Sequence, residues 1–260
     1  MSTRYFINYI FLSFSILMLL QSCVSKKQTL YLQDAESYNN IDVKYTNNIL
    51  QVDDILKISV DAIIPEAALP YNNKMGGGSV VGNNIEIMKL DGYLVSQNST
   101  INLPILGELS VKNKTTKDLQ NDIKKLLVDG GYLINPTVTV RLINSKVTIL
   151  GEVNTPGTFS ITENNISLLQ VLGLAGDLTI NGSREDVMVL RRINGVQTTM
   201  RINLTSASFL NGPYQMVKPN DVIIVNPNSA KISSAGYVGN LSAILGIASI
   251  LLTSIVLLTR

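Results

Sequence analysis

The chain has 260 residues, of which 45% are hydrophobic, so it can form one or two packed domains. Its formal net charge is +2 and it has no long basic run, which argues against a nucleic-acid surface. Histidine is absent and cysteine occurs once, which excludes His-based general-base catalysis, Ser-His and Cys-His pairs, and the common Cys/His zinc sites.

The amino end is predicted to be a secretory signal. Arg4 precedes an apolar run over residues 9–20, which is short for a membrane span and is followed by small polar residues. The sole cysteine, Cys23, ends the sequence Leu-Gln-Ser-Cys, which resembles the lipobox at which bacterial lipoprotein signals are cut and acylated. A lone thiol has no partner for an intrachain disulfide, so we expect residues 1–22 to be removed and Cys23 to be lipidated. The alternative is an incidental or buried thiol in an uncleaved anchor.

The next segment, residues 23–48, is predicted to be a tether. It is polar, rich in Asn, Gln and Tyr, and has little periodicity. Ser25 stands two positions after Cys23. Lipoproteins retained at the inner membrane favour Asp at this position, so by resemblance to lipoprotein sorting signals Ser25 favours the outer membrane.

Residues 49–145 are predicted to form a small α+β domain. Residues 55–60 alternate apolar and polar side chains, as a half-buried strand does. Asp53-Asp54 before them is interpreted as a turn, because neighbours in an extended chain point to opposite faces and make a poor acid/base pair. Pro104 breaks the strand pattern of residues 101–111, and residues 136–142 alternate again.

A helix is expected between these strands. Thr115-Thr116-Lys117-Asp118 has the features of a helix start, and Gly130-Gly131 those of an end. The apolar residues at helical spacing, which are expected to face the sheet, are Leu119, Ile123, Leu126 and Leu127.

Residues 146–228 are predicted to form a second domain. A strand over residues 147–153 leads to Pro156-Gly157, a turn expected to need positive φ at the glycine. Ser167 to Gln170 form a capping box that opens a helix ending at Gly176. Three strands follow, near residues 187–190, 200–204 and 222–225, with a hairpin predicted over residues 191–195.

The two domains share a faint internal echo. Residues 52–58 and 219–225 each contain a turn, an Asp and an apolar strand. The similarity is too short to prove duplication, but it indicates that each domain opens or closes with a strand led by Asp.

The carboxyl end, residues 229–260, contains an uncharged apolar stretch over residues 241–259 that is long enough to cross a bilayer as a helix. Ser242, Gly246, Ser249 and Thr253 fall at helical spacing along one face. Two interpretations are open. The stretch is a simple anchor whose small residues pack on a neighbouring helix, or it is one stave of a multi-helix ring with the small residues facing a lumen.

Together these features resemble the outer-membrane polysaccharide export lipoproteins, the Wza-type capsule translocons. Residues 54–60, 101–107 and the helix to residue 140 resemble the polysaccharide-export domain. Residues 147–159 with Gly151 and Pro156-Gly157, followed by residues 172–176 and Arg191-Arg192, resemble a soluble-ligand-binding β-grasp (SLBB) domain. Only one β-grasp unit is present where larger members have two, and Asp177 stands where many members have a second glycine.

The resemblance implies a homo-oligomeric ring in the periplasm, whose carboxyl-terminal helices form a barrel through the outer membrane with Ser242, Gly246, Ser249 and Thr253 as candidate pore-lining residues. It also implies an inner-membrane polysaccharide copolymerase of the tyrosine-kinase type as a partner. We expect a passive channel for capsular polysaccharide or exopolysaccharide without catalytic residues, metal or cofactor. The alternative is a membrane-tethered glycan-binding or scaffold lipoprotein without a pore.

Overall fold

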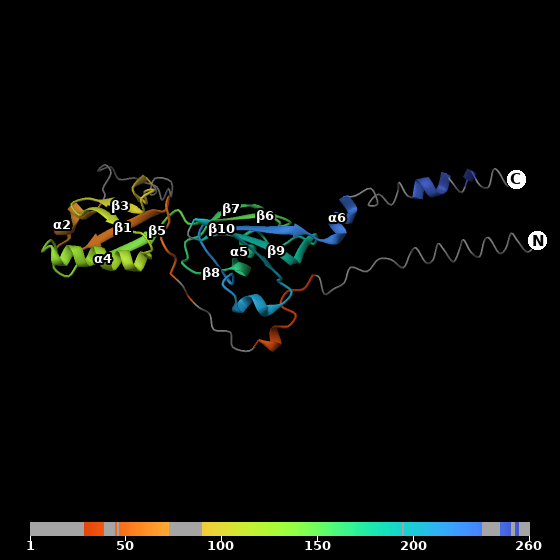
Figure 1. Ribbon diagram of the computed structural model, residues 1–260, viewed down its shortest axis with the longest axis horizontal. Coiled ribbons are helices and arrows are strands. Elements are labelled where there is room, and N and C mark those ends of the chain that lie inside the picture. Colours follow the sequence, from red (N-terminus) through yellow and green to blue (C-terminus); the bar gives the residue numbers. More distant parts are fainter. Residues whose placement is uncertain are drawn as a thin grey trace, which may run out of the picture.

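The computed structural model describes residues 29–38, 45, 47–72, 90–193, 195–235, 245–250 and 253–254. Cys23 and Ser242 lie outside the described residues. Two units follow one another along the chain, and each combines a sheet with a helix (Figure 1). The described chain is therefore α+β, as the sequence predicts.

The first unit has a three-stranded antiparallel sheet, a separate hairpin and one long helix, α4 (Thr116–Asp129). In spatial order the sheet consists of β2 (Tyr93–Leu94), β1 (Ile55–Asp61) and β5 (Thr137–Leu142). The hairpin is β3 (Thr100–Leu103) and β4 (Gly107–Ser110), joined at the predicted break around Pro104. The short helical turns of this unit are α2 (Pro65–Ala68) and η3 (Leu69–Tyr71), whereas η2 (Ala35–Ser37) follows Asp34, which bonds to the second unit.

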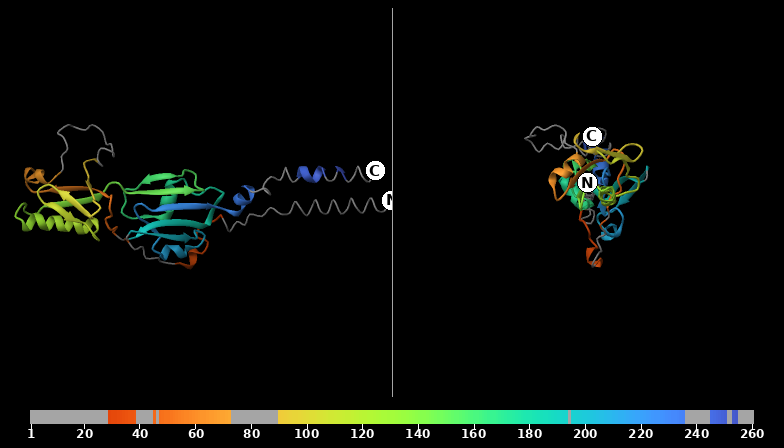
Figure 2. Two further views of the ribbon diagram at one scale, coloured as in Figure 1. Left: turned by 45° about the horizontal axis from the view of Figure 1, so that its top comes forward. Right: turned by 90° about the vertical axis from the view of Figure 1, so that its left-hand side faces the viewer.

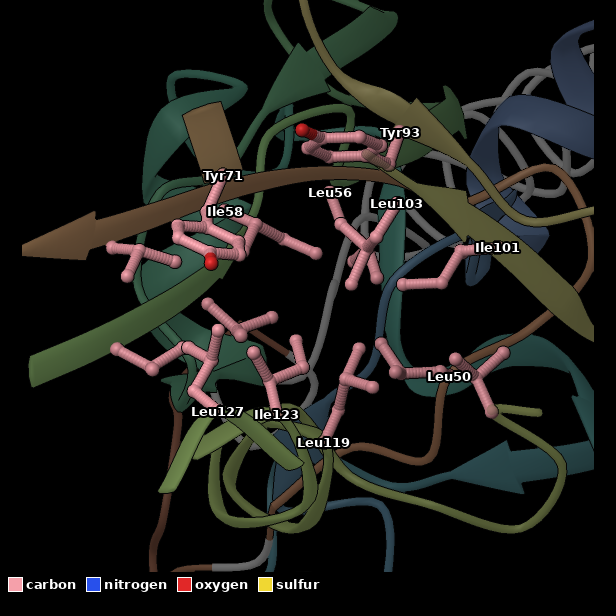
Figure 3. Packing of buried hydrophobic residues seen from close by; sticks show 14 of the residues in the cluster. Leu50, Leu56, Ile58, Tyr71, Tyr93, Ile101, Leu103, Leu119, Ile123 and Leu127 are labelled. Carbon is pink, nitrogen blue, oxygen red and sulfur yellow. The ribbon is translucent and has the colours of Figure 1, made fainter. Parts of the chain in front are cut away.

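The helix α4 begins at a full capping box and covers the core of the first unit. The Thr115 hydroxyl accepts from the Asp118 amide at 3.2 Å, and the Asp118 carboxylate accepts from the Thr115 amide at 2.9 Å. Leu119, Ile123 and Leu127 face the apolar side of the sheet and hairpin (Figure 3). The prediction that Leu126 shares this face is wrong. Leu126 is 41% exposed, because it lies at the edge of the helix face that buries Leu119, Ile123 and Leu127.

The second unit is a five-stranded mixed sheet with α5 (Leu168–Leu174) beside it. Its spatial order is β10 (Val196–Ile202), β9 (Gly182–Ile193), β12 (Val222–Pro227), β6 (Lys146–Gly151) and β7 (Gly157–Ser160). The central strand β12 runs parallel to β6 and antiparallel to β9. Smaller elements are β8 (Ile166–Ser167), η4 (Ala207–Asn211), β11 (Met216–Val217) and α6 (Ser229–Ala235).

One local prediction for the second unit is wrong, and a second is confirmed with narrower bounds. Gly157 begins β7 and is not among the glycines with positive φ, whereas Gly151 at the end of β6 has a φ of +88°. The hairpin predicted over residues 191–195 is tighter than expected, since β9 continues to Ile193 and β10 starts at Val196. Arg191 therefore lies within a strand, and it points into the interior with only 3% of its surface exposed.

The connection between the units is short. Only residues 143–145 separate β5 from β6, and Ser145 among them is buried. The Asn144 side chain accepts from the Ile55 amide at 2.9 Å and donates to the Asp53 carbonyl at 2.8 Å, which fixes the start of β1 to the connection. The units stand end to end in two views, with α6 at the end of the second unit away from the first (Figures 1 and 2).

Candidate functional site

A cleft of about 500 Å³ lies where the two units meet. The first unit contributes the turn before β1, with Asp54, and the loop before α4, with Lys112. The second unit contributes Arg192 near the end of β9 and Lys218 in the turn before β12. Across its floor, the Asn48 side-chain amide donates to the Asn164 carbonyl at 3.3 Å. The volume falls within the range of about 300–1,000 Å³ that is usual for small-molecule sites.

The two turns that echo one another in sequence have the same backbone structure and line the same cleft. In each, a residue with positive φ precedes a buried aspartate, with φ +70° at Asp53 and +66° at Asn220. In each, the buried carboxylate accepts from the amide three positions earlier, at 2.8 Å for Asp54 and 2.9 Å for Asp221. The echo is thus a shared turn in which the aspartate side chain replaces a backbone acceptor.

The two aspartates differ in their partners. Asp221 forms a buried ion pair with Arg191, whose Nη2 lies 2.7 Å from Oδ2 and whose Nε lies 3.0 Å from Oδ1. The same guanidinium donates to the carbonyls of Pro213 and Met216 and stacks on the ring of Tyr214, 4.4 Å from its centroid. This pair is internal to the second unit, and it holds β9 to the turn before β12.

Among the described residues, no cation forms an ion pair with Asp54. Burial raises the pKa of its carboxyl to about 6, and the charge of Asp53 adds to the increase while the hydrogen bond from the Gln51 amide opposes it. Only 5% of Asp54 is exposed, although the residue lines the cleft. Its charged form is therefore costly in the folded protein.

We expect Asp54 to make the protein less stable as the pH rises from about 4 to 6. Within this window the folded protein binds the proton and the unfolded chain does not, so the free energy of unfolding falls with rising pH, by up to about 3 kcal/mol. Asp54→Asn keeps an acceptor for the Gln51 amide without the charge. It should flatten this slope and raise stability at pH 7, as measured by urea unfolding across the pH range. Asp53→Asn in the same turn should retain most of the slope; equal slopes in wild type and Asp54→Asn would contradict the assignment.

The start of the described chain packs on the second unit, although residues 23–48 were predicted to be a tether. The Leu32 amide donates to the Leu204 carbonyl at 3.0 Å, and the Gln33 amide to the Thr205 carbonyl at 2.7 Å. The Asp34 carboxylate accepts from the Ala207 amide and the Ser206 hydroxyl, and these bonds hold its pKa below the usual range. We call residues 31–34 the strap. Sequence periodicity could not reveal its packing, because each of these contacts joins residues more than 170 positions apart.

Tyr31 in this strap covers a buried arginine. Its ring lies 5.5 Å from the guanidinium of Arg184, which otherwise donates to the carbonyls of Thr179 and Gly182. The Tyr31 hydroxyl donates to the Asp177 carboxylate, and burial together with this bond raises the pKa of the tyrosine. Asp177 has a φ of +71°, a conformation that Asp tolerates better than most residues.

The predicted tail residues are only partly described. Residues 245–250 and 253–254 are helical, and they include Gly246, Ser249 and Thr253. The Ser249 hydroxyl donates to the Gly246 carbonyl at 2.8 Å, and the Thr253 hydroxyl to the Ser249 carbonyl at 2.6 Å. Within the described residues, no helix is long and apolar enough to cross a membrane. The structure does not bring these residues together with the cleft.

Comparison with known protein families identifies the chain. Residues 43–143 match the family described as polysaccharide biosynthesis/export protein, and residues 145–225 match the SLBB domain. The chain thus joins a polysaccharide biosynthesis/export domain to an SLBB domain. The family comprises export proteins and is not a family of enzymes. The cleft between the two units therefore lies at the junction of the export domain and the SLBB domain.

Curated relatives of this chain carry matching names. It is 25% identical over 187 residues to the EPS I polysaccharide export outer membrane protein EpsA of Ralstonia solanacearum, covering 70% of this chain and 48% of the relative. It is 27% identical over 197 residues to the capsule polysaccharide export protein BexD of Haemophilus influenzae, covering 74% of this chain and 46% of the relative. The chain thus spans about half the length of these curated relatives.

Sequence reasoning missed the groups that line the cleft. Arg192 was placed in a hairpin turn, and Lys112 and Lys218 carried no motif. The useful signal was the echo between the two Asp-led turns, since both turns prove to border the cleft. No group of three His, Cys, Asp or Glu side chains in the described ranges is arranged to hold a metal ion.

Proposed function

We propose that this chain exports a capsular polysaccharide or exopolysaccharide across the outer membrane, as the subunit of a homo-oligomeric lipoprotein channel. The observation that carries the proposal is the position of the two chain ends on the second unit. Tyr31, near the start of the described chain, bonds to Asp177, and Asn228, just before α6, donates from its amide to the Asn181 carbonyl. The two ends thus leave the same side of the SLBB domain.

Both predicted membrane attachments follow or precede that side by only a few residues of sequence. Cys23 precedes Thr29 by six positions, and the apolar stretch beginning at residue 241 follows Ala235 by six positions. Six residues reach at most about 22 Å when fully extended. A lipid on Cys23 and a span over residues 241–259 would therefore hold the SLBB domain near the outer membrane and direct the export domain into the periplasm. This arrangement is consistent with a signal at residues 1–22 and with domains at residues 49–145 and 146–228.

The tail fits the role of a barrel stave. Gly246, Ser249 and Thr253 lie on one helical face, and the hydroxyls of Ser249 and Thr253 donate to the carbonyls of Gly246 and Ser249. The hydroxyl protons of such a face need no acceptor on a neighbouring helix, and the face tolerates water and sugar better than leucine does. In a ring of identical chains this face, with Ser242, would line the lumen. The energy for transport would come from an inner-membrane polysaccharide copolymerase of the tyrosine-kinase type.

The test combines particle images with an export assay. We expect the detergent-extracted full-length protein to form closed rings in electron micrographs. Gly246→Leu with Ser249→Leu should narrow the lumen and lower cell-surface polysaccharide by at least about tenfold while rings persist. Ala248→Leu, on the opposite side of the same helix, is the matched control and should export normally.

A different set of results would favour the alternative function. If the extracted protein is a monomer, and the leucine substitutions leave surface polysaccharide unchanged, the channel proposal fails. The chain would then act as a membrane-tethered glycan-binding or scaffold lipoprotein.

A further inference from the structure

The cleft between the two units contains three cationic side chains from three separate loops. Lys112 follows β4, Arg192 is near the end of β9, and Lys218 is in the turn before β12. None of the three forms an ion pair within the described residues, in contrast to Lys114, Arg191 and Arg201, which all do. The short connection between the units keeps the loops of both on one cleft.

The two carboxylates that line the same cleft form no ion pair with these three cations among the described residues, and they are fewer than the cations. The Asp54 carboxylate is turned toward the Gln51 amide, which donates to it at 2.8 Å, and it is almost fully buried. The Glu163 carboxylate accepts from the amide of Thr162 at 3.1 Å and from its hydroxyl at 3.3 Å, so it is directed at its own loop. The accessible part of the cleft therefore carries a positive charge excess.

The rest of the lining is rich in groups that suit sugar hydroxyls. The side-chain amides of Asn47, Gln51 and Asn113 border the cleft and take part in no intramolecular hydrogen bond that the described residues provide. An amide presents a donor and an acceptor side by side, which is the pattern that two neighbouring hydroxyls of a sugar ring require. A phosphate or acidic-peptide site would need the cations but not this set of free amides.

We infer that this cleft binds an acidic segment of the transported glycan, with Lys112, Arg192 and Lys218 holding sugar carboxylates and the amides holding ring hydroxyls. The inference rests on the proposed export function and specifies its cargo: a polysaccharide that contains uronic or other carboxylated sugars. Charge-assisted bonds from lysine and arginine supply the discrimination against neutral sugars. The polymer contacts the cleft reversibly, with no bond made or broken.

Calorimetric titration of the full-length protein in detergent tests this inference. We expect a galacturonic acid trisaccharide to bind at least about tenfold more tightly than the matching galactose trisaccharide, with affinity falling as salt rises. Arg192→Gln and Lys218→Gln should each weaken binding about three- to tenfold. Lys125→Gln on the exposed face of α4 makes the same charge change away from the cleft and should bind like wild type. Thermal unfolding midpoints check that each variant is folded.

A second measurement needs no variant. Bound acid trisaccharide should protect Lys112 and Lys218 from chemical acetylation while leaving Lys125 reactive. Equal affinity for the two trisaccharides, or equal weakening by Lys125→Gln, overturns the inference. Inorganic phosphate that displaces the trisaccharide at equal concentration would show an anion site only and would also overturn it. Rings that export polymer normally despite such results would leave the channel proposal standing, so the two failures are distinguishable.

Discussion

Gly151→Ala should unfold the second unit or destabilise it by about 3–5 kcal/mol. Gly151 ends β6 with a φ of +88° and pairs with Val225 of the central strand β12. A Cβ there would lie 2.1 Å from the Val225 carbonyl oxygen, which accepts from the Glu152 amide at 3.0 Å. Both contacting groups are backbone, so no side chain can move aside, and β6 would have to separate from β12.

The matched control for this substitution is Gly195→Ala in the β9–β10 turn. Gly195 has a similar φ of +80°, but a Cβ there would meet no atom within 4 Å. It should cost about 1 kcal/mol, the strain of positive φ alone. Urea unfolding followed by circular dichroism measures both variants. Similar losses for the two would mean that backbone conformation, and not the contact with β12, makes glycine necessary at position 151.

Removing one member of the Arg191–Asp221 pair should destabilise the second unit by about 3–5 kcal/mol. Asp221→Ala leaves a guanidinium with only 3% exposure without its carboxylate, and it also removes the acceptor of the Lys218 amide. The remaining carbonyl partners, Pro213 and Met216, satisfy hydrogen bonds but do not balance the charge. Urea unfolding at neutral pH gives the loss.

Two further variants separate the charge from the packing. The double substitution Arg191→Met with Asp221→Leu removes both charges and should recover most of the stability, because apolar side chains of similar volume avoid the desolvation penalty. Asp186→Ala breaks the exposed pair with Arg201, and it should cost no more than about 1 kcal/mol. A double variant as unstable as Asp221→Ala would show that hydrogen-bond geometry, and not unpaired charge, sets the loss.

The Arg191–Asp221 pair bears on the cleft as well as on stability. The Arg191–Asp221 pair fixes the turn that carries Lys218, and β9 positions Arg192 directly after Arg191. Adjacent residues in a strand point to opposite faces, so Arg191 is buried while Arg192 lines the cleft. Arg191 thus supplies a structural charge, and Arg192 supplies a candidate ligand-binding charge.

The sequence by itself determined the elements whose signals are local. The capping boxes at Thr115 and Ser167 predicted the starts of α4 and α5, and alternation predicted β1 and its buried face. These predictions succeed because a capping box spans four residues and a strand face repeats every two, so no distant contact is needed. The order of these elements also predicted the α+β class.

Only the tertiary structure decided the features that depend on distant partners. Gly151 and not Gly157 has positive φ, and a Cβ at Gly151 would meet the Val225 carbonyl of β12. Arg191 is buried because it meets Asp221 from 30 positions away, and Tyr31 docks because Asp177, 146 positions away, lies beside it. The cleft likewise exists only where loops of both units converge. Contacts at such separations are set by chain topology, and local residue patterns carry no record of them.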